Sequence, residues 1–155
     1  MQLTDVLRPE VVKMELKART RDEAIRELVE LLAKAGGLRQ GDVESMTAAI
    51  LKREALGSTA IGKSVAIPHA KAPTAQEFVA ALGRSTPGIE FASIDGKPVN
   101  LVFLLASPPD SQRAHLKALA HISRLVSKGD LCARILAAKN EKDIIEIIAE
   151  KENGL

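Results

Sequence analysis

Apolar and polar positions follow clear patterns in the first third of the chain, and these patterns predict one strand and two helices. Residues 11–17 alternate apolar with charged side chains, as a half-buried strand does. The sequence Thr-Arg-Asp-Glu at 20–23 is a capping box, which predicts a helix whose apolar stripe continues to the glycine pair at 36–37. A second helix is expected over 42–56, with Asp42 as its N-cap.

Two strand-like runs occupy the middle of the chain. One covers residues 78–85. The other, at 99–107, is almost continuously apolar, which is typical of a central strand covered on both faces. Gly88 and the segment Asp-Gly-Lys-Pro at 95–98 indicate turns between these two strands.

Helical patterns dominate the last third of the chain. They cover 111–127 and roughly 130–138, and Asn140 is placed to cap a last helix that follows it. Strands and helices are therefore interleaved, which predicts an α/β fold with three α/β/α layers: a central mixed β-sheet with helices on both faces. No repeat, low-complexity tract or long linker interrupts the chain, so residues 1–155 are expected to form a single domain.

Composition argues against several classes of function. The net charge of +2 at pH 7 is too small to indicate a nucleic-acid or membrane partner, and the 2% of aromatic residues offers no base-stacking platform. No apolar run approaches the ~20 residues of a membrane-spanning helix, and the first residues do not form a signal peptide. We therefore expect a cytoplasmic protein with no nucleic-acid partner and no membrane insertion.

The segment GSTAIGKSVAIPHAK at 57–71 supports two different interpretations. Its first eight residues match the phosphate-loop pattern G-x-x-x-x-G-K-[ST] of nucleotide-binding proteins. Its second half is a short apolar run that stops at Pro68-His69, so that the histidine would be presented from the end of a strand. A phosphate loop follows a strand and opens a helix, whereas here a predicted helix precedes Gly57 and Pro68 prevents a helix after Ser64. This order favours the histidine interpretation.

The chain has three histidines, and their spacing matches no common zinc pattern, so no metal site is predicted. His115 lies in the first turn of the helix over 111–127, at the edge of an expected buried stripe and close to the end of the strand at 99–107. That stripe consists of Leu116, Leu119, Ile122, Ser123 and Val126. His121 is expected to be structural or at the surface. Because strand ends and the helix starts that follow them commonly build sites in α/β proteins, His69 and His115 are the candidates for chemistry.

Two histidines near one site suit phosphoryl transfer, because a neutral imidazole nitrogen can attack phosphorus at neutral pH. The transferring group carries spread negative charge and needs fixed donors around it. Arg53, Ser58, Thr59 and Gly62 lie close to His69 in sequence and could supply such donors. The plainer alternatives are a solvated helix charge for Arg53 and a backbone turn at Gly62.

Three sequence blocks resemble one known family. REALGSTAIGKSVAIPHAK (53–71) resembles the active-site signature of the fructose/mannitol class of enzyme IIA domains, which belong to the phosphoenolpyruvate-dependent phosphotransferase system. DGKPVNLVFLLASP (95–108) and HLKALAHISRL (115–125) resemble its second and third blocks, in the same order and spacing. The resemblance covers nearly the whole chain.

The resemblance implies a three-layer α/β fold and a phosphohistidine mechanism without a metal, nucleotide or other cofactor. His69 matches the family's phosphorylated histidine. His115 matches the second histidine, which donates to the phosphoryl group, and Arg53 matches an arginine beside the site. The implied donor is a phosphorylated histidine phosphocarrier protein, HPr or its nitrogen-branch counterpart. No role is implied for His121.

The blocks are more similar to the stand-alone nitrogen-regulatory branch than to the sugar-transport branch, which implies regulation of partner proteins. Two alternatives stay open. The chain could be a transport component that passes the phosphoryl group to a IIB domain, or a regulatory binding module whose His69 accepts no phosphoryl group.

Overall fold

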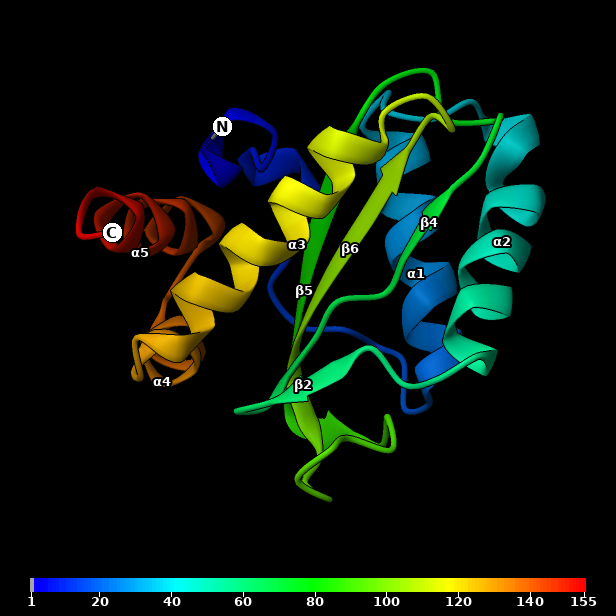
Figure 1. Cartoon of the computed structure of the whole chain (residues 1–155). Coiled ribbons are helices and arrows are strands. Elements are labelled where there is room, and N and C mark those ends of the chain that lie inside the picture. The colour runs from blue at the N-terminus through cyan, green and yellow to red at the C-terminus, as the bar shows by residue number, and fades with distance from the viewer. Residues whose placement is uncertain (1) are drawn as a thin grey trace.

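The computed structural model of the chain describes residues 2–155 and contains a six-stranded sheet flanked by five α-helices (Figure 1). The strands are β1 (Val12–Lys13), β2 (Ala60–Gly62), β3 (Val65–Ala66), β4 (His69–Lys71), β5 (Val79–Ile89) and β6 (Val99–Ser107). The helices are α1 (Arg21–Lys34), α2 (Val43–Ala55), α3 (Gln112–Ser127), α4 (Leu131–Ala137) and α5 (Glu141–Asn153). Short 3-10 helices cover Leu3–Asp5, Pro9–Val11 and Gln40–Asp42.

The sheet mixes parallel and antiparallel pairs around its central strand β6. The strand order is β1-β5-β6-β3-β2, with β5 antiparallel to β6 and both β3 and β4 parallel to it. The short strands β3 and β4 follow one another along the same edge of β6, where Val65 lies opposite Leu101 and His69 opposite Leu105. This register brings His69 level with the C-terminal end of β6.

Helices cover both faces of the sheet. Figure 1 shows α1 and α2 on one side and α3, α4 and α5 on the other. Eight of the nine residues of β6 are buried, as expected for a strand covered on both faces. The predicted three-layer α/β/α fold with a central mixed sheet is therefore confirmed. Asn140 caps α5 as predicted, because its side chain accepts a hydrogen bond from the backbone N–H of Asp143 at 2.8 Å.

Two strand predictions need correction. The expected strand at 11–17 is reduced to the two residues of β1, although Leu16 N–H still donates to the carbonyl of Arg84 at 2.7 Å. Gly88 was expected in a turn, but it lies within β5, where the register with β6 is irregular. Its φ of +85° and a gap of only 2.8 Å between a Cβ placed there and Cβ of Pro98 explain why glycine occupies this position.

The buried face of α3 also differs from the prediction. Leu116 is 57% exposed and Ser123 is exposed, whereas His115, Ala118 and Leu125 point inward. The apolar pattern missed this orientation because it places histidines on the polar side. A histidine can take an inward position when its ring nitrogen has a hydrogen-bond partner, as the Nδ1 of His115 does.

A buried hydrogen-bonded contact joins the two ends of the chain to α3. Nε2 of His121 lies 2.6 Å from Oε2 of Glu152, and both side chains are buried. The same carboxylate accepts hydrogen bonds from the backbone N–H of Leu3 and from the hydroxyl of Thr4, the latter at 2.9 Å. His121 is thus structural, as expected, and Glu152 connects the first 3-10 helix with α5.

Candidate active site

His69 opens strand β4 directly after Pro68, with its side chain half-buried. Its Nδ1 lies 2.7 Å from the carbonyl oxygen of Ile67. A carbonyl oxygen can only accept, so Nδ1 carries the ring proton and donates it to Ile67. Nε2 is then left unprotonated, with a lone pair available for nucleophilic attack.

His115 lies against His69, although the two residues come from different elements. The ring centroids are 5.1 Å apart and the ring planes are inclined by 58°. His115 is 4% exposed, and its Nδ1 lies 2.7 Å from Oγ of Ser107 at the end of β6. When the serine hydroxyl donates to Nδ1, the proton of a neutral His115 resides on Nε2, which becomes a hydrogen-bond donor.

Both imidazoles are neutral at pH 7. Burial lowers the pKa of His69, and the positive charges of Arg53 and Lys71 add to this effect, while the bond to Ile67 and the charge of Glu54 oppose it. Burial, together with His69 and Lys71, lowers the pKa of His115 to about 4. A neutral imidazole is the nucleophilic form, so His69 has the protonation state that nucleophilic attack requires.

Arg53 and Glu54 bring opposite charges to the site from the last turns of α2. Nη1 of Arg53 donates to the carbonyl of Gly57 at 2.9 Å. Glu54 is 2% exposed, and its carboxylate accepts from the backbone N–H of Thr59 at 2.8 Å and from the Thr59 hydroxyl at 2.7 Å. These contacts close the loop between α2 and β2, and they fix Glu54 as a buried negative charge near His69.

The other predicted donors take up structural positions. The hydroxyl of Ser58 donates to the carbonyl of Phe91 and accepts from Ala60 N–H at 3.1 Å, and the Thr59 hydroxyl is bonded to Glu54. Gly62 is not brought to His69. It pairs with Val65 at the level of Leu101, whereas His69 lies opposite Leu105, roughly 13 Å further along the sheet.

The segment that matches the phosphate-loop pattern, residues 57–64, covers the loop after α2, strand β2 and the turn that leads into β3. A helix therefore precedes it and a strand follows it, as the order of predicted elements indicated. Gly62, Lys63 and Ser64 have φ values of +88°, +54° and +67°, the backbone of a tight turn. Strand β3 follows Ser64 directly, so the segment does not open a helix as a nucleotide-binding phosphate loop does.

Sequence reasoning missed Ser107 and Glu54 as residues of the site. Ser107 ends an apolar strand and is wholly buried. In the sequence, Glu54 resembles the other charged residues of a helix that is exposed to solvent. The sequence signals for these two residues were that Glu54 follows Arg53 directly and that Ser107 ends the strand before the helix of His115. These signals are weak, because the sequence does not show which strand end contacts which helix.

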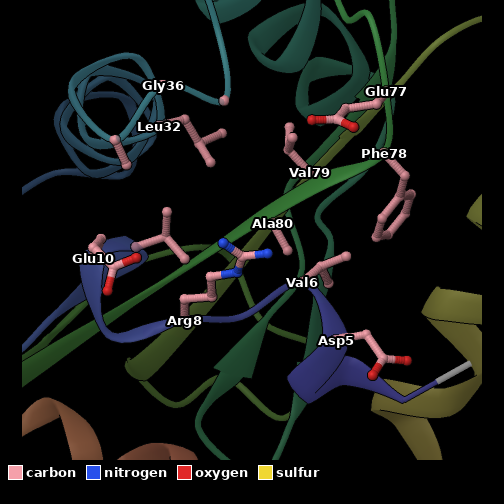
Figure 2. A pocket seen from close by; sticks show the side chains of 13 residues that line it. Asp5, Val6, Arg8, Glu10, Leu32, Gly36, Glu77, Phe78, Val79 and Ala80 are labelled. Carbon is pink, nitrogen blue, oxygen red and sulfur yellow. The ribbon is translucent and has the colours of Figure 1, made fainter.

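A polar hollow of about 330 Å³ lies elsewhere, between the N-terminal segment, the end of α1 and the start of β5. Figure 2 shows Arg8 reaching into it, with Asp5 and Glu10 on either side and Glu77 and Phe78 at its rim. Neither His69 nor His115 lines it. Within residues 2–155, no group of three or more His, Cys, Asp or Glu side chains could hold a metal ion, and no helix is long and apolar enough to cross a membrane.

Comparison with known families assigns the class of this α/β domain. The family described as "Phosphoenolpyruvate-dependent sugar phosphotransferase system, EIIA 2" matches residues 5–151. The chain therefore belongs to the EIIA type 2 family of the phosphotransferase system, as its resemblance implied. Members of this family are phosphocarriers, and EIIA domains pass phosphate between components of the system.

Individual relatives come from two branches of the family. A nitrogen regulatory protein of Bradyrhizobium diazoefficiens is 38% identical, over 96% of this chain and 95% of the relative. The fructose-specific EIIABC component of Bacillus subtilis is 36% identical over 98% of this chain, which spans only 24% of that longer protein. The crystal structure of nitrogen regulatory protein IIA-Ntr from Neisseria meningitidis has a TM-score of 0.80 at 25% identity, covering 94% of this chain and 98% of that chain.

Proposed function

We propose that Nε2 of His69 accepts a phosphoryl group from a phosphorylated HPr-like protein and that the chain then carries this group to its partners. The observation that carries the proposal is the hydrogen bond from Nδ1 of His69 to the Ile67 carbonyl, 2.7 Å long. It holds the ring in the tautomer whose Nε2 is the nucleophile, and it fixes the ring orientation before the donor arrives.

The transfer step balances with these groups alone. The Nε2 lone pair attacks the phosphorus of the donor's phosphohistidine, and the donor's N–P bond breaks, returning its electron pair to the donor imidazole. The new N–P bond gives the His69 ring positive charge. The Ile67 carbonyl stabilises this charge because it already accepts the Nδ1 proton, so no proton has to leave during attack.

Positive and donor groups around His69 suit the charge of the transferring phosphoryl group. Arg53 and Lys71 both act on His69 electrostatically, and His115 presents its ring 5.1 Å away. With its proton on Nε2, His115 donates a hydrogen bond to a phosphoryl oxygen. Catalysis of this kind consists mainly of positioning and charge stabilisation. Glu54 has the opposite effect and keeps the phosphohistidine transferable.

We propose that regulated partner proteins bind differently to the phosphorylated and unphosphorylated forms of the chain. The similarity to nitrogen regulatory proteins, which extends over nearly the full length of both chains, supports this choice. The alternative is a transport role with a IIB domain as acceptor, which the 36% identity to a fructose-specific EIIABC component supports.

The experiment combines phosphoenolpyruvate, enzyme I and an HPr-like donor with the wild-type chain and with His69→Ala. We expect wild-type protein to gain the mass of one phosphoryl group and His69→Ala to gain none. Ring ¹⁵N spectra should assign the bond to Nε2 of His69. Label on the variant or on Nδ1 would refute the proposed chemistry, and an unlabelled wild-type protein would support the binding-module alternative.

A further inference from the structure

Helix α3 carries four cationic side chains along its outer side. Arg113, Lys117, Arg124 and Lys128 are all exposed and follow each other at intervals of four, seven and four residues. At 3.6 residues per turn, these positions fall within an arc of about 60°. They therefore form one stripe, about 22 Å long, which we call the α3 basic stripe.

The four side chains of the stripe are not paired with carboxylates in the described part of the chain. Within residues 2–155, none of its four side chains takes part in an ion pair, and α3 contains no Asp or Glu. The neighbouring helices differ, since Arg134 of α4 pairs with Glu150 of α5, and Lys151 pairs with Asp130. Positive charge on α3 is thus left uncompensated, although the whole chain has a net charge of only +2.

Small and apolar side chains lie beside the stripe. Leu116 is 57% exposed, and Ala120, Ser123 and Ser127 continue along the same side of the helix at intervals of three or four residues. Small side chains allow another helix to approach closely, and Leu116 offers it an apolar anchor. This side of α3 is exposed, whereas the opposite side of the helix is buried.

We propose that the α3 basic stripe, together with Leu116, is a docking site for an acidic helical surface of a partner protein. Charge complementarity selects an acidic occupant, because four unpaired cations in register attract a row of carboxylates. A membrane fits less well, since the broad apolar face of α3 is already buried against the sheet and Leu116 alone would insert. Single-stranded nucleic acid fits less well because α3 has no aromatic side chain for stacking, and the net charge of +2 is small for binding a duplex.

The test uses unphosphorylated protein and a fluorescent helical peptide about as long as the 16 residues of α3, with glutamates on one face and leucines beside them. We expect saturable binding that weakens as salt increases. Replacing the four cations of the stripe by Gln should weaken binding by at least tenfold, about the combined effect of several exposed ion pairs. Leu116→Ser should weaken it about threefold.

A matched control distinguishes binding by the α3 basic stripe from nonspecific attraction to the protein's positive charge. Lys17, Lys34, Lys97 and Lys142 are exposed on other elements, and replacing them by Gln changes the net charge equally. We expect this control to bind the peptide within twofold of wild type. Equal losses in both variants, or tighter binding to phosphatidylserine vesicles or duplex DNA than to the peptide, would overturn the proposal. Phosphoryl uptake at His69 is measured separately, so either proposal can fail alone.

Discussion

Oγ of Ser107 lies 2.7 Å from Nδ1 of His115, so this contact occupies one of the two ring nitrogens of the buried histidine. The serine ends β6 and the histidine lies in the first turn of α3, so the strand-to-helix connection brings the two side chains together. In the proposed mechanism Ser107 is a positioning residue that acts through His115.

Ser107→Ala should slow phosphoryl uptake by about three- to tenfold, because His115 loses the bond that keeps its proton on Nε2. Rapid-quench kinetics would measure the rate, and ring ¹⁵N shifts would report the tautomer of His115. Ser85→Ala is the matched control, since Ser85 is equally buried on β5 but its hydroxyl accepts from Gly88 N–H. If both variants transfer at the same rate, Ser107 has only a packing role.

The pKa of His115, lowered to about 4, predicts that the protein loses stability in mild acid. Between pH 6.5 and 4 the unfolded chain binds a proton at this residue and the folded chain does not, so the free energy of unfolding falls as pH decreases. The loss should be roughly 2–3 kcal/mol and should level off below pH 4. The lowered pKa of His69 acts in the same direction.

Urea denaturation at several pH values would measure this dependence. His115→Gln removes the titrating group, so its stability should vary less between pH 6.5 and 4 than that of the wild type. A variant whose stability falls as steeply as that of the wild type would assign the pH effect to other groups.

Glu54→Gln should both loosen the α2–β2 loop and lengthen the life of the phosphohistidine. The amide oxygen can still accept from the backbone N–H of Thr59, and the amide nitrogen can donate to the Thr59 hydroxyl, but both bonds lose their charge assistance, which costs about 1–2 kcal/mol of stability. Removing the buried negative charge also lowers the repulsion felt by a phosphoryl group on His69. Hydrolysis of the purified phosphoprotein gives the lifetime.

Glu44→Gln serves as the control for the phosphohistidine lifetime. Glu44 belongs to the same helix but pairs with Arg26 at the surface. We expect its phosphohistidine to decay like that of the wild type. If the phosphohistidine of Glu54→Gln also decays at the wild-type rate, the charge of Glu54 does not act on the phosphoryl group.

Glu152→Gln should destabilise the protein by about 1–3 kcal/mol without changing phosphoryl uptake, because the buried hydrogen bonds of Glu152 to His121, Leu3 and Thr4 are structural. Thermal unfolding and the uptake assay would check the two halves of this prediction. Glu150→Gln, which removes only an exposed pair with Arg134, should cost less than about 1 kcal/mol. Loss of uptake in folded Glu152→Gln would connect these buried bonds to the active site.

Most of the fold could be predicted because its patterns are local. The apolar run at 99–107 coincides with β6, and the three C-terminal helices begin and end within one or two residues of their predicted bounds. The strand at 11–17 was overestimated because only Val12 and Lys13 have register partners on β5, a constraint that no local pattern shows.

The site was less predictable because its contacts join distant segments. His69 and His115 were found from their neighbours in sequence, whereas Ser107 and Glu54 gain their roles only once β6 meets α3 and the loop after α2 closes. Gly62 was wrongly placed beside His69 because the two residues are close in sequence. It lies near His69 along the chain, but the register of β2, β3 and β6 carries it away.

The contacts of Glu152 have a consequence for how such a domain can be joined to others. They hold the start and the end of the chain against α3, and Figure 1 shows both ends on the side away from β4. A polypeptide fused at either end would therefore leave from the same side of the domain, away from β4 and its His69. This geometry lets one architecture work as a separate protein or as a module within a longer chain.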